Sequence, residues 1–290
     1  MLTRTCAVCC WPHALSRVDA ILAALSNDVL EDRDALATFL ASAAATYEPT
    51  LEAAGRLRAQ AGLPITLTLR LEAESLPLAL ATSVDLVLTN CGRLLLINYR
   101  GTAPWDLLNW LVDLDVGEQP VHEGFLRNYL CTSGAVDEAW RAAVAGEAMD
   151  PHLPAAAGPL EAVVVTGHSL GGALAQLLGT LGEPRRLPMV KHVVTFGQPM
   201  IGDAGFQTRL RTPLLRVVMP GDVVPLLPPF ARFQHAGRCL LLAERQTPLA
   251  WWRLAVHGLR RLYYGDLAVL DHLPLRYLRR LERSGAKLKP

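Results

Sequence analysis

The stretch at residues 162–182 constrains the fold more than any other part of the chain. Its 21 residues contain no Asp, Glu, Lys or Arg, so it is long enough to cross a bilayer. A polar, glycine-rich break at residues 166–172 nevertheless divides it into a short β-branched run and a longer Ala/Leu run. This pattern favours a buried strand, a tight turn and a buried helix over a membrane span. We therefore predict a strand at 161–166 and a helix at 170–181.

The alternation of strands and helices continues after this stretch. Short apolar runs predict strands at 190–196 and 214–219, with a helix at 203–210 between them. Upstream, strands are expected at 65–71, 85–89 and 93–99, and a helix at 125–145. Strands that alternate with helices form a mostly parallel sheet covered on both faces, so the predicted class is α/β.

The N-terminal part has a different pattern. Residues 15–60 are rich in Ala, Leu and alternating charges, with no Gly or Pro before Pro49, which predicts helices. No linker is long enough to separate two domains. We therefore divide the chain into a helical N-terminal extension at 1–62 and a single α/β domain at 63–290.

Composition excludes several classes of protein. Hydrophobic residues make up 51% of the chain and charged residues 19%, enough apolar material for a buried core. The net charge of +1 gives no reason to expect nucleic acid as a partner. The charge is uneven, because residues 251–290 contain nine Lys or Arg and three Asp or Glu. A basic C-terminal part is either a solvated face or a surface attracted to anionic partners.

The six cysteines are too few for a disulfide scaffold, and Cys6 and Cys9 lack a second pair at zinc-ligand spacing. Reduced thiols in a cytosolic protein fit them better. No apolar run near residue 1 has the form of a secretory signal. We therefore expect a cytoplasmic location, with membrane association as the alternative, and chemistry that requires no cofactor or metal.

Residues 167–171 read Gly-His-Ser-Leu-Gly between the predicted strand and helix. A sharp strand-to-helix turn forces the central residue, Ser169, into a strained backbone conformation, and small residues two positions away on each side avoid clashes. The hydroxyl then projects from the carboxyl end of the sheet beside the positive end of the helix. This context favours a nucleophile over the alternative, an ordinary tight turn.

A serine nucleophile needs an imidazole base and a carboxylate that sets the tautomer of that base. On this kind of turn the partners follow in the order Ser, acid, His. Asp222 stands out among the downstream acids, because a predicted strand and a Pro-Gly turn directly precede it. Among the downstream histidines, His192 would lie at the wrong end of a strand and His257 within a predicted helix. The remaining histidines are His235 and His272.

Taken together, these motifs resemble those of the fungal-type triacylglycerol lipases, also called class 3 lipases, which have the α/β-hydrolase fold. The resemblance runs from about residue 90 to residue 277. Each motif alone is weakly specific, whereas six in the family's order are strongly specific. They lie at residues 90–102, 121–125, 167–172, 195–203, 221–229 and 272–277.

The resemblance implies roles for individual residues. It selects Asp222 as the acid and His272 as the base, and it makes His235 a non-catalytic histidine. The oxyanion hole would combine the Leu170 N–H with the N–H and hydroxyl of Thr102. His122 matches a family position that we interpret as a hydrogen-bonded strut, and Asp203 one that we interpret as a turn or helix cap.

The resemblance also places a lid over the site at residues 103–111, and the alternative is a surface helix packed on the core. We assign four side chains to the lid and substrate-binding group. They are Trp105, Leu108, Trp110 and His168.

A second apolar surface is predicted at residues 248–266. There Trp251 and Trp252 lie on the apolar arc of a helix whose other arc carries Arg253, Arg260 and Arg261. Such a helix suits a membrane interface as a second cap, and docking on the domain with a solvated basic face is an equal alternative.

The function predicted from the sequence is hydrolysis of lipid esters, first of acylglycerols, through Ser169, Asp222 and His272. A phospholipase A1-type activity is the next candidate. A non-catalytic lipase-like interaction protein and a membrane-binding module are the rivals from other classes. The expected partners are a lipid ester and, through residues 251–264, the surface of a membrane or a lipid droplet.

Overall fold

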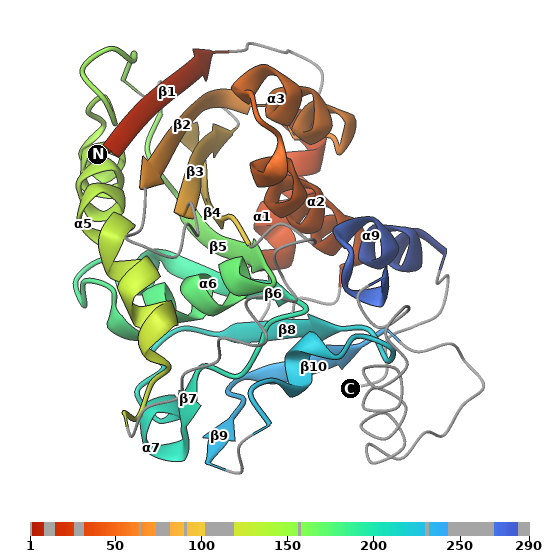
Figure 1. Ribbon diagram of the computed structural model, residues 1–290. Helices are drawn as coiled ribbons and strands as arrows, with labels where there is room; N and C mark the ends of the chain where they lie inside the picture. Colours follow the sequence, from red (N-terminus) through yellow and green to blue (C-terminus); the bar gives the residue numbers. More distant parts are fainter. Residues whose placement is uncertain are drawn as a thin grey trace.

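The structure is a computed structural model that describes residues 2–8, 15–25, 32–63, 65–73, 82–89, 92–101, 119–155, 158–229, 232–242 and 270–283. A central sheet lies between two layers of helices (Figure 1). The strands from β4 to β10 pair in parallel, and those from β1 to β4 pair antiparallel. The eight strands follow the order β1 (Leu2–Val8), β2 (Ile65–Ala73), β3 (Thr82–Thr89), β4 (Leu94–Tyr99), β5 (Ala162–His168), β6 (Val190–Phe196), β8 (Leu214–Val218) and β10 (Arg238–Leu241).

A two-stranded sheet of β7 (Gly202–Asp203) and β9 (Phe233–Gln234) lies beside the central one. The helices of one layer are α5 (Glu123–Ala145) and α6 (Leu170–Leu181). Those of the other layer are α1 (Leu15–Leu25), α2 (Arg33–Ala44) and α9 (Pro274–Arg283). The remaining helices are α3 (Leu51–Gln60), the short α7 (Ala204–Gln207), and the 3₁₀ turns η1 (Ala45–Tyr47), η3 (Leu187–Met189), η4 (Val224–Leu226) and η5 (Leu270–His272).

Alternate residues of the strands pack into two hydrophobic cores, one on each face of the sheet. Val163 and Val165 of β5 pack with α5 and α6, whereas Val164 between them packs with α1, α2 and α9 on the opposite face. This is the arrangement expected of a strand buried on both faces. The predicted α/β class, with helices on both faces, is therefore confirmed, and no helix in the described ranges has the length and apolarity to cross a membrane.

Most predicted elements lie within a few residues of the observed ones. The exception is the helix expected at 203–210, which is only the single turn of α7. Asp203 caps it by accepting a hydrogen bond from the Phe206 N–H. The N–H groups of Arg209 and Leu210 then bond to carbonyls three residues back rather than four, which ends the helix.

The sequence predicts a helical extension at 1–62, but the structure shows that this segment also contains a strand. Residues Leu2–Val8 form β1, the edge strand paired with β2 from Leu2↔Ala73 to Val8↔Leu67. Its partner strand lies far along the chain, so local periodicity could not reveal the pairing. Ile21, Leu36 and Phe39 of the following helices are buried in the same core as the strands, so this segment is an integral part of the fold.

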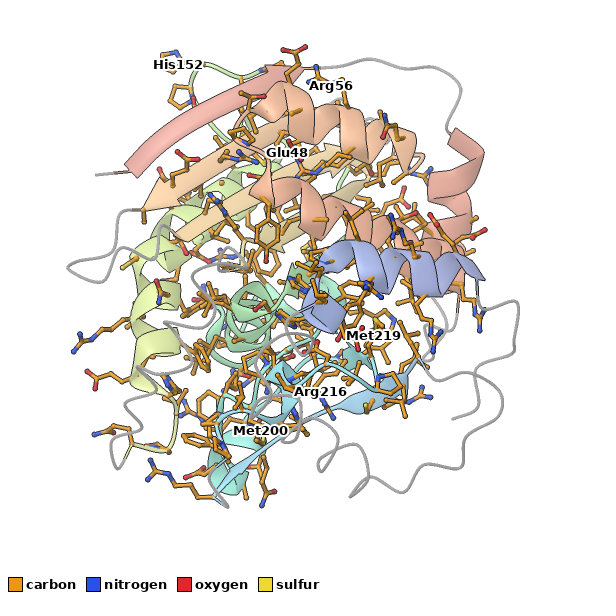
Figure 2. The ribbon with its side chains drawn as sticks, turned by 45° about the vertical axis from the view of Figure 1, so that its right-hand side comes forward. Glu48, Arg56, His152, Met200, Arg216 and Met219 are labelled. Carbon is orange, nitrogen blue, oxygen red and sulfur yellow. The ribbon has the colours of Figure 1, made fainter. Side chains whose placement is uncertain are left out.

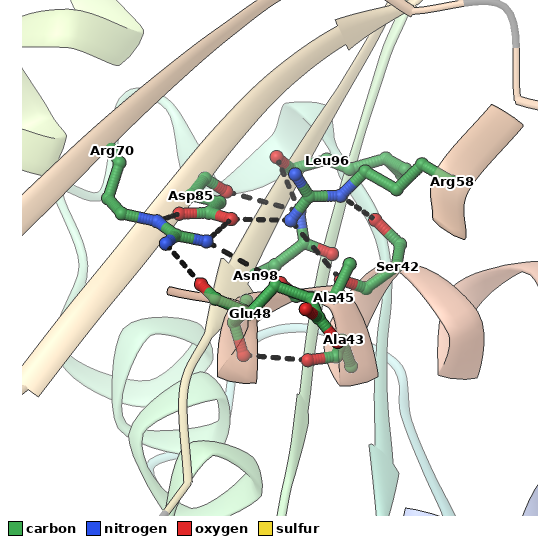
Figure 3. A network of polar contacts seen from close by, with 10 residues as sticks. Ser42, Ala43, Ala45, Glu48, Arg58, Arg70, Asp85, Leu96 and Asn98 are labelled. Atoms are coloured by element: carbon green, nitrogen blue, oxygen red, sulfur yellow. Dashed lines mark hydrogen bonds and ion pairs between the residues drawn. The ribbon is translucent and has the colours of Figure 1, made fainter. Parts of the chain in front are cut away.

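A buried ion cluster joins these helices to the sheet (Figure 3). Asp85 on β3 accepts hydrogen bonds from Arg58 of α3 at 2.5 Å and from Nε of Arg70 of β2 at 2.7 Å. Arg70 also donates to the Glu48 carbonyl, and Arg58 to the Ser42 hydroxyl. Burial opposes ionisation of Asp85, but the two guanidinium groups outweigh it and hold its pKa below the usual range.

Candidate active site

Ser169 occupies the sharp turn between β5 and α6. Its φ of 59° and ψ of −129° make it the only non-glycine residue with positive φ in the described ranges. A Cβ at Gly167 would collide with the Gly171 carbonyl, and one at Gly171 with the Tyr99 carbonyl. The turn therefore requires glycine at both positions, as the sequence pattern indicates. Backbone strain of this kind is characteristic of functional positions.

An acid–base pair lies at the ends of the later elements. Nδ1 of His272, at the end of η5, lies 2.8 Å from Oδ2 of Asp222, which follows β8. The Tyr277 hydroxyl donates to the same carboxylate oxygen at 2.5 Å, and the Val224 N–H donates to Oδ1 at 2.9 Å. Both oxygens of the buried carboxylate therefore have donors. Because Nδ1 carries the proton shared with Asp222, Nε2 of His272 is left as the basic nitrogen.

Ser169 and the His272–Asp222 pair lie close together. The His272 ring centroid is 4.5 Å from that of His168, the residue directly before Ser169. Oγ of Ser169 and Nε2 of His272 are both buried and form no hydrogen bond within the described part of the chain. These are the two atoms between which a general base would transfer the proton, and their hydrogen bond commonly tightens only when substrate binds.

His168 has a different environment from the one expected. The sequence prediction placed it among the substrate-binding side chains, but it is buried and protein groups occupy both ring nitrogens. Nε2 lies 2.6 Å from the backbone carbonyl of His272, and Nδ1 lies 3.0 Å from the Tyr47 hydroxyl. A carbonyl only accepts, so Nε2 carries the proton and Tyr47 donates to Nδ1. His168, directly before Ser169, thus links Tyr47 to the backbone of His272.

The charge state of these groups agrees with that assignment. Burial, with the neighbouring His272, holds the pKa of His168 well below its usual value, so the imidazole is neutral. Burial also raises the pKa of Tyr47, which remains a protonated donor. A single arrangement of protons therefore satisfies the chain from Tyr47 through His168 to His272.

Tyr47 is the site residue that the sequence analysis missed. It lies 121 residues before His168, in the segment that no motif covered. A Cβ built on Gly101 would collide with its hydroxyl and would lie 3.1 Å from Cβ of Ser169. Tyr47 therefore lies where the segment entering the predicted oxyanion strand meets the nucleophile turn.

The other predicted residues are distributed as follows. His235 donates from Nε2 to the Pro225 carbonyl at 2.7 Å, outside the acid–base pair. His122 is buried, Asp203 caps α7, and Leu170 is the first residue of α6. No cluster of three or more metal-ligating side chains occurs among the described residues. Some of the predicted site residues lie outside the described ranges. They are Thr102, Trp105, Leu108, Trp110 and the segment 251–264.

Comparisons with known proteins show which families the chain resembles. Residues 96–232 match the family described as "Lipase (class 3)". A triacylglycerol lipase OBL1 of Ricinus communis is 32% identical over 206 residues, which is 53% of this chain and 39% of that protein. A phospholipase A1-II 3 of Oryza sativa subsp. indica is 29% identical over 200 residues, 58% of this chain and 47% of that protein. The chain thus spans less than half the length of these relatives.

The fold has close counterparts among solved structures. A triacylglyceride lipase of Rhizomucor miehei superposes with a TM-score of 0.55 at 21% identity, covering 93% of this chain and 96% of that one. At this identity the likeness demonstrates the fold alone. The chain is thus similar to the class 3, fungal-type lipases over residues 96–232, a range that contains Ser169 and Asp222, and it has the α/β-hydrolase fold.

Proposed function

We propose that the protein is a serine carboxylic-ester hydrolase that acts on acylglycerols. The observation that carries this proposal is the buried His272–Asp222 pair beside the strained Ser169. A carboxylate bonded to Nδ1 sets the imidazole tautomer and stabilises the imidazolium that forms when the base takes a proton. Structural serines in tight turns need no such partner.

The reaction would proceed as acyl transfer in two steps. His272 removes the Ser169 proton as the hydroxyl oxygen attacks the ester carbonyl, and the imidazolium then protonates the leaving alkoxide. Water attacks the resulting acyl-enzyme by the reverse sequence and releases the carboxylic acid. Tyr277 and the Val224 N–H hold the Asp222 carboxylate in place during both steps.

The tetrahedral oxygen would be stabilised by backbone donors. Leu170 is the first residue of α6, where a backbone N–H has no acceptor within the helix. We assign one donor to this group and a second to Thr102, which follows Gly101 beside the nucleophile turn. The lid at 103–111 and the segment 251–264 remain our candidates for contact with a lipid surface.

The relatives suggest two substrate classes. The Ricinus communis protein is named as a triacylglycerol lipase, which supports acylglycerols as the first choice. The Oryza sativa protein is named as a phospholipase A1, which supports phospholipid as the second. A panel of glycerides, phospholipids and short esters, with and without vesicles, would separate the two.

Labelling with a fluorophosphonate probe tests the nucleophile directly. We expect the wild type to be labelled, Ser169→Ala to be unlabelled, and esterase kcat to fall by about 10³-fold or more in that variant. The matched control is Ser133→Ala, whose hydroxyl bonds only to the Leu130 carbonyl on the outside of α5. Absence of labelling and turnover in the wild type would instead support the non-catalytic interaction protein.

A further inference from the structure

A cavity lies behind the loop that carries Asp222. It has a volume of about 230 Å³, is lined by residues of β8, β10 and η4, and is open to solvent on one side. Most of its lining is apolar, including Met200 and Met219, and its polar lining consists of Arg216, Asp222, His235 and Cys239. Arg216, Met200 and Met219 lie in the lower half of the view in Figure 2. The proposed reaction assigns no role to Arg216, His235 or Cys239.

Arg216 is the unusual member of this lining. The residue is 8% exposed, and its Nε donates to the Ala236 carbonyl at 2.8 Å. Within the described ranges, no carboxylate lies within ion-pair distance of it, and its two terminal nitrogens have no acceptor. These nitrogens are not among the buried atoms that lack a partner, so they keep access to solvent in the cavity, where a ligand could take the place of water. Partial burial of the charge without a counter-ion still carries a desolvation cost.

The neighbouring groups do not supply the missing charge. Cys239 lies directly across from Arg216 in the parallel pairing of β10 and β8, so both side chains leave the sheet on the same face. Burial raises the pKa of the Cys239 thiol and lowers that of Arg216. Burial and the nearby Arg216 also lower the pKa of His235 to about 3, so this ring is neutral. The cavity thus contains one cationic group with a neutral thiol and a neutral imidazole, and the Asp222 carboxylate in its lining is already bonded to His272, Tyr277 and the Val224 N–H.

We propose that this cavity binds an aliphatic carboxylate, with the carboxylate on Arg216 and the hydrocarbon chain against the apolar lining. A guanidinium presents paired N–H donors that match a carboxylate. Inorganic phosphate fits less well, because it has no hydrocarbon chain to contact the apolar part of the lining. Apolar cavities of roughly 150 Å³ accommodate benzene, so a 230 Å³ cavity accommodates a chain of about six carbons.

The ligand belongs to the chemical class that ester hydrolysis releases. The link to a reaction product rests on the proposed function, whereas the binding itself does not. Because the acid loop forms one wall of the cavity, an occupant would contact the element that holds Asp222.

Calorimetric titration of hexanoate into Ser169→Ala protein tests the site without turnover. We expect saturable binding that weakens at least tenfold in the double variant with Arg216→Met, which removes the charge and keeps a long apolar side chain. The matched control is Arg211→Met, an exposed arginine just before β8, which should leave the affinity unchanged.

Two further ligands complete the test. Hexanamide and inorganic phosphate should each bind at least tenfold more weakly than hexanoate. Equal affinity for hexanamide would show that the site does not recognise the negative charge. Equal affinity for phosphate would show that the site does not recognise the hydrocarbon chain. Either result, or hexanoate binding that is unaffected by Arg216→Met, would overturn the proposal. Since the protein used lacks Ser169, failure of this test leaves the ester hydrolase proposal standing.

Discussion

Two regions at opposite sides of the central sheet contain buried arginines within the described ranges, and only one of them supplies a carboxylate as counter-charge. At the β2–β3 side, Arg58 and Arg70 share the Asp85 carboxylate and also bond to backbone and hydroxyl oxygens (Figure 3). At the β8–β10 side, Arg216 has one backbone carbonyl and no carboxylate within the described ranges. The first site is an internal connection, whereas the second has the properties of a place for a ligand.

The difference shows that burial of an arginine has no single meaning. A charge that is paired with a buried carboxylate attaches one element to another, and removal of that carboxylate leaves the guanidinium groups without a counter-charge in the apolar interior. A charge without such a partner carries a desolvation cost that an external group can offset. The same residue type therefore predicts opposite effects of mutation at the two sites.

The largest expected effect is at the network around Asp85. Asp85→Asn leaves two buried guanidinium groups without a counter-charge, and we expect the free energy of unfolding to fall by about 3–5 kcal/mol. Urea denaturation at pH 7 measures it. Glu52→Gln breaks an exposed pair with Arg56 and should cost at most about 0.5 kcal/mol. A similar small loss for Asp85→Asn would refute the comparison.

The same variant has a predictable pH dependence. The pKa of Asp85 is lower in the folded state than in the unfolded chain, where it is about 3.9. Its contribution to stability is therefore complete above pH 4 and lost as the pH falls through the folded value. The stability difference between wild type and Asp85→Asn should shrink on acidification. A difference that grows below pH 4 would contradict this assignment.

The Arg216 site should respond in the opposite direction. Arg216→Met removes a buried charge and fills most of its volume, so we expect the free energy of unfolding to rise by about 1–2 kcal/mol in ligand-free protein. Thermal denaturation compared with Arg211→Met measures the change. A loss of 2 kcal/mol or more would mean that the guanidinium is already stabilised within the protein.

The smallest expected effect concerns the contacts that connect the Asp85 network to the candidate active site. Arg70 holds the Glu48 carbonyl at 2.6 Å, next to Tyr47, whose hydroxyl bonds to His168. Tyr47→Phe removes that hydrogen bond, worth about 1 kcal/mol. We expect kcat to fall about fivefold with KM unchanged. Tyr129→Phe, the same change in a buried tyrosine on α5, serves as the control, and equal losses in both variants would refute a positioning role.

Much of the site follows from short stretches of sequence. The glycines around Ser169 and the apolar runs on each side predict the strand, the turn and the helix, because each of these depends on neighbours a few residues apart. The acid loop is likewise predictable, since Asp222 follows a strand and a Pro-Gly turn. The choice of His272 over His235 came from the family resemblance, because no local pattern separates the two.

Other parts could not be predicted in this way. The pairing of β1 with β2, the bond from Tyr47 to His168 and the isolation of Arg216 all join residues distant in sequence. His168 illustrates the limit, because its position beside Ser169 suggested contact with substrate. The fold instead buries the ring between Tyr47 and the backbone of His272.

The amino-acid sequence by itself determined the α/β class, the tight turn at Ser169 and the resemblance to the class 3 lipases, since these depend on periodicity, small residues and motif order along the chain. Only the tertiary structure decided which side chains meet. It joined Asp222 to His272, linked Tyr47 through His168 to the backbone of His272, and left Arg216 without a carboxylate in the described ranges. The physical reason is that hydrogen bonds and ion pairs depend on distance in space, which the chain sets only once its strands and helices have packed.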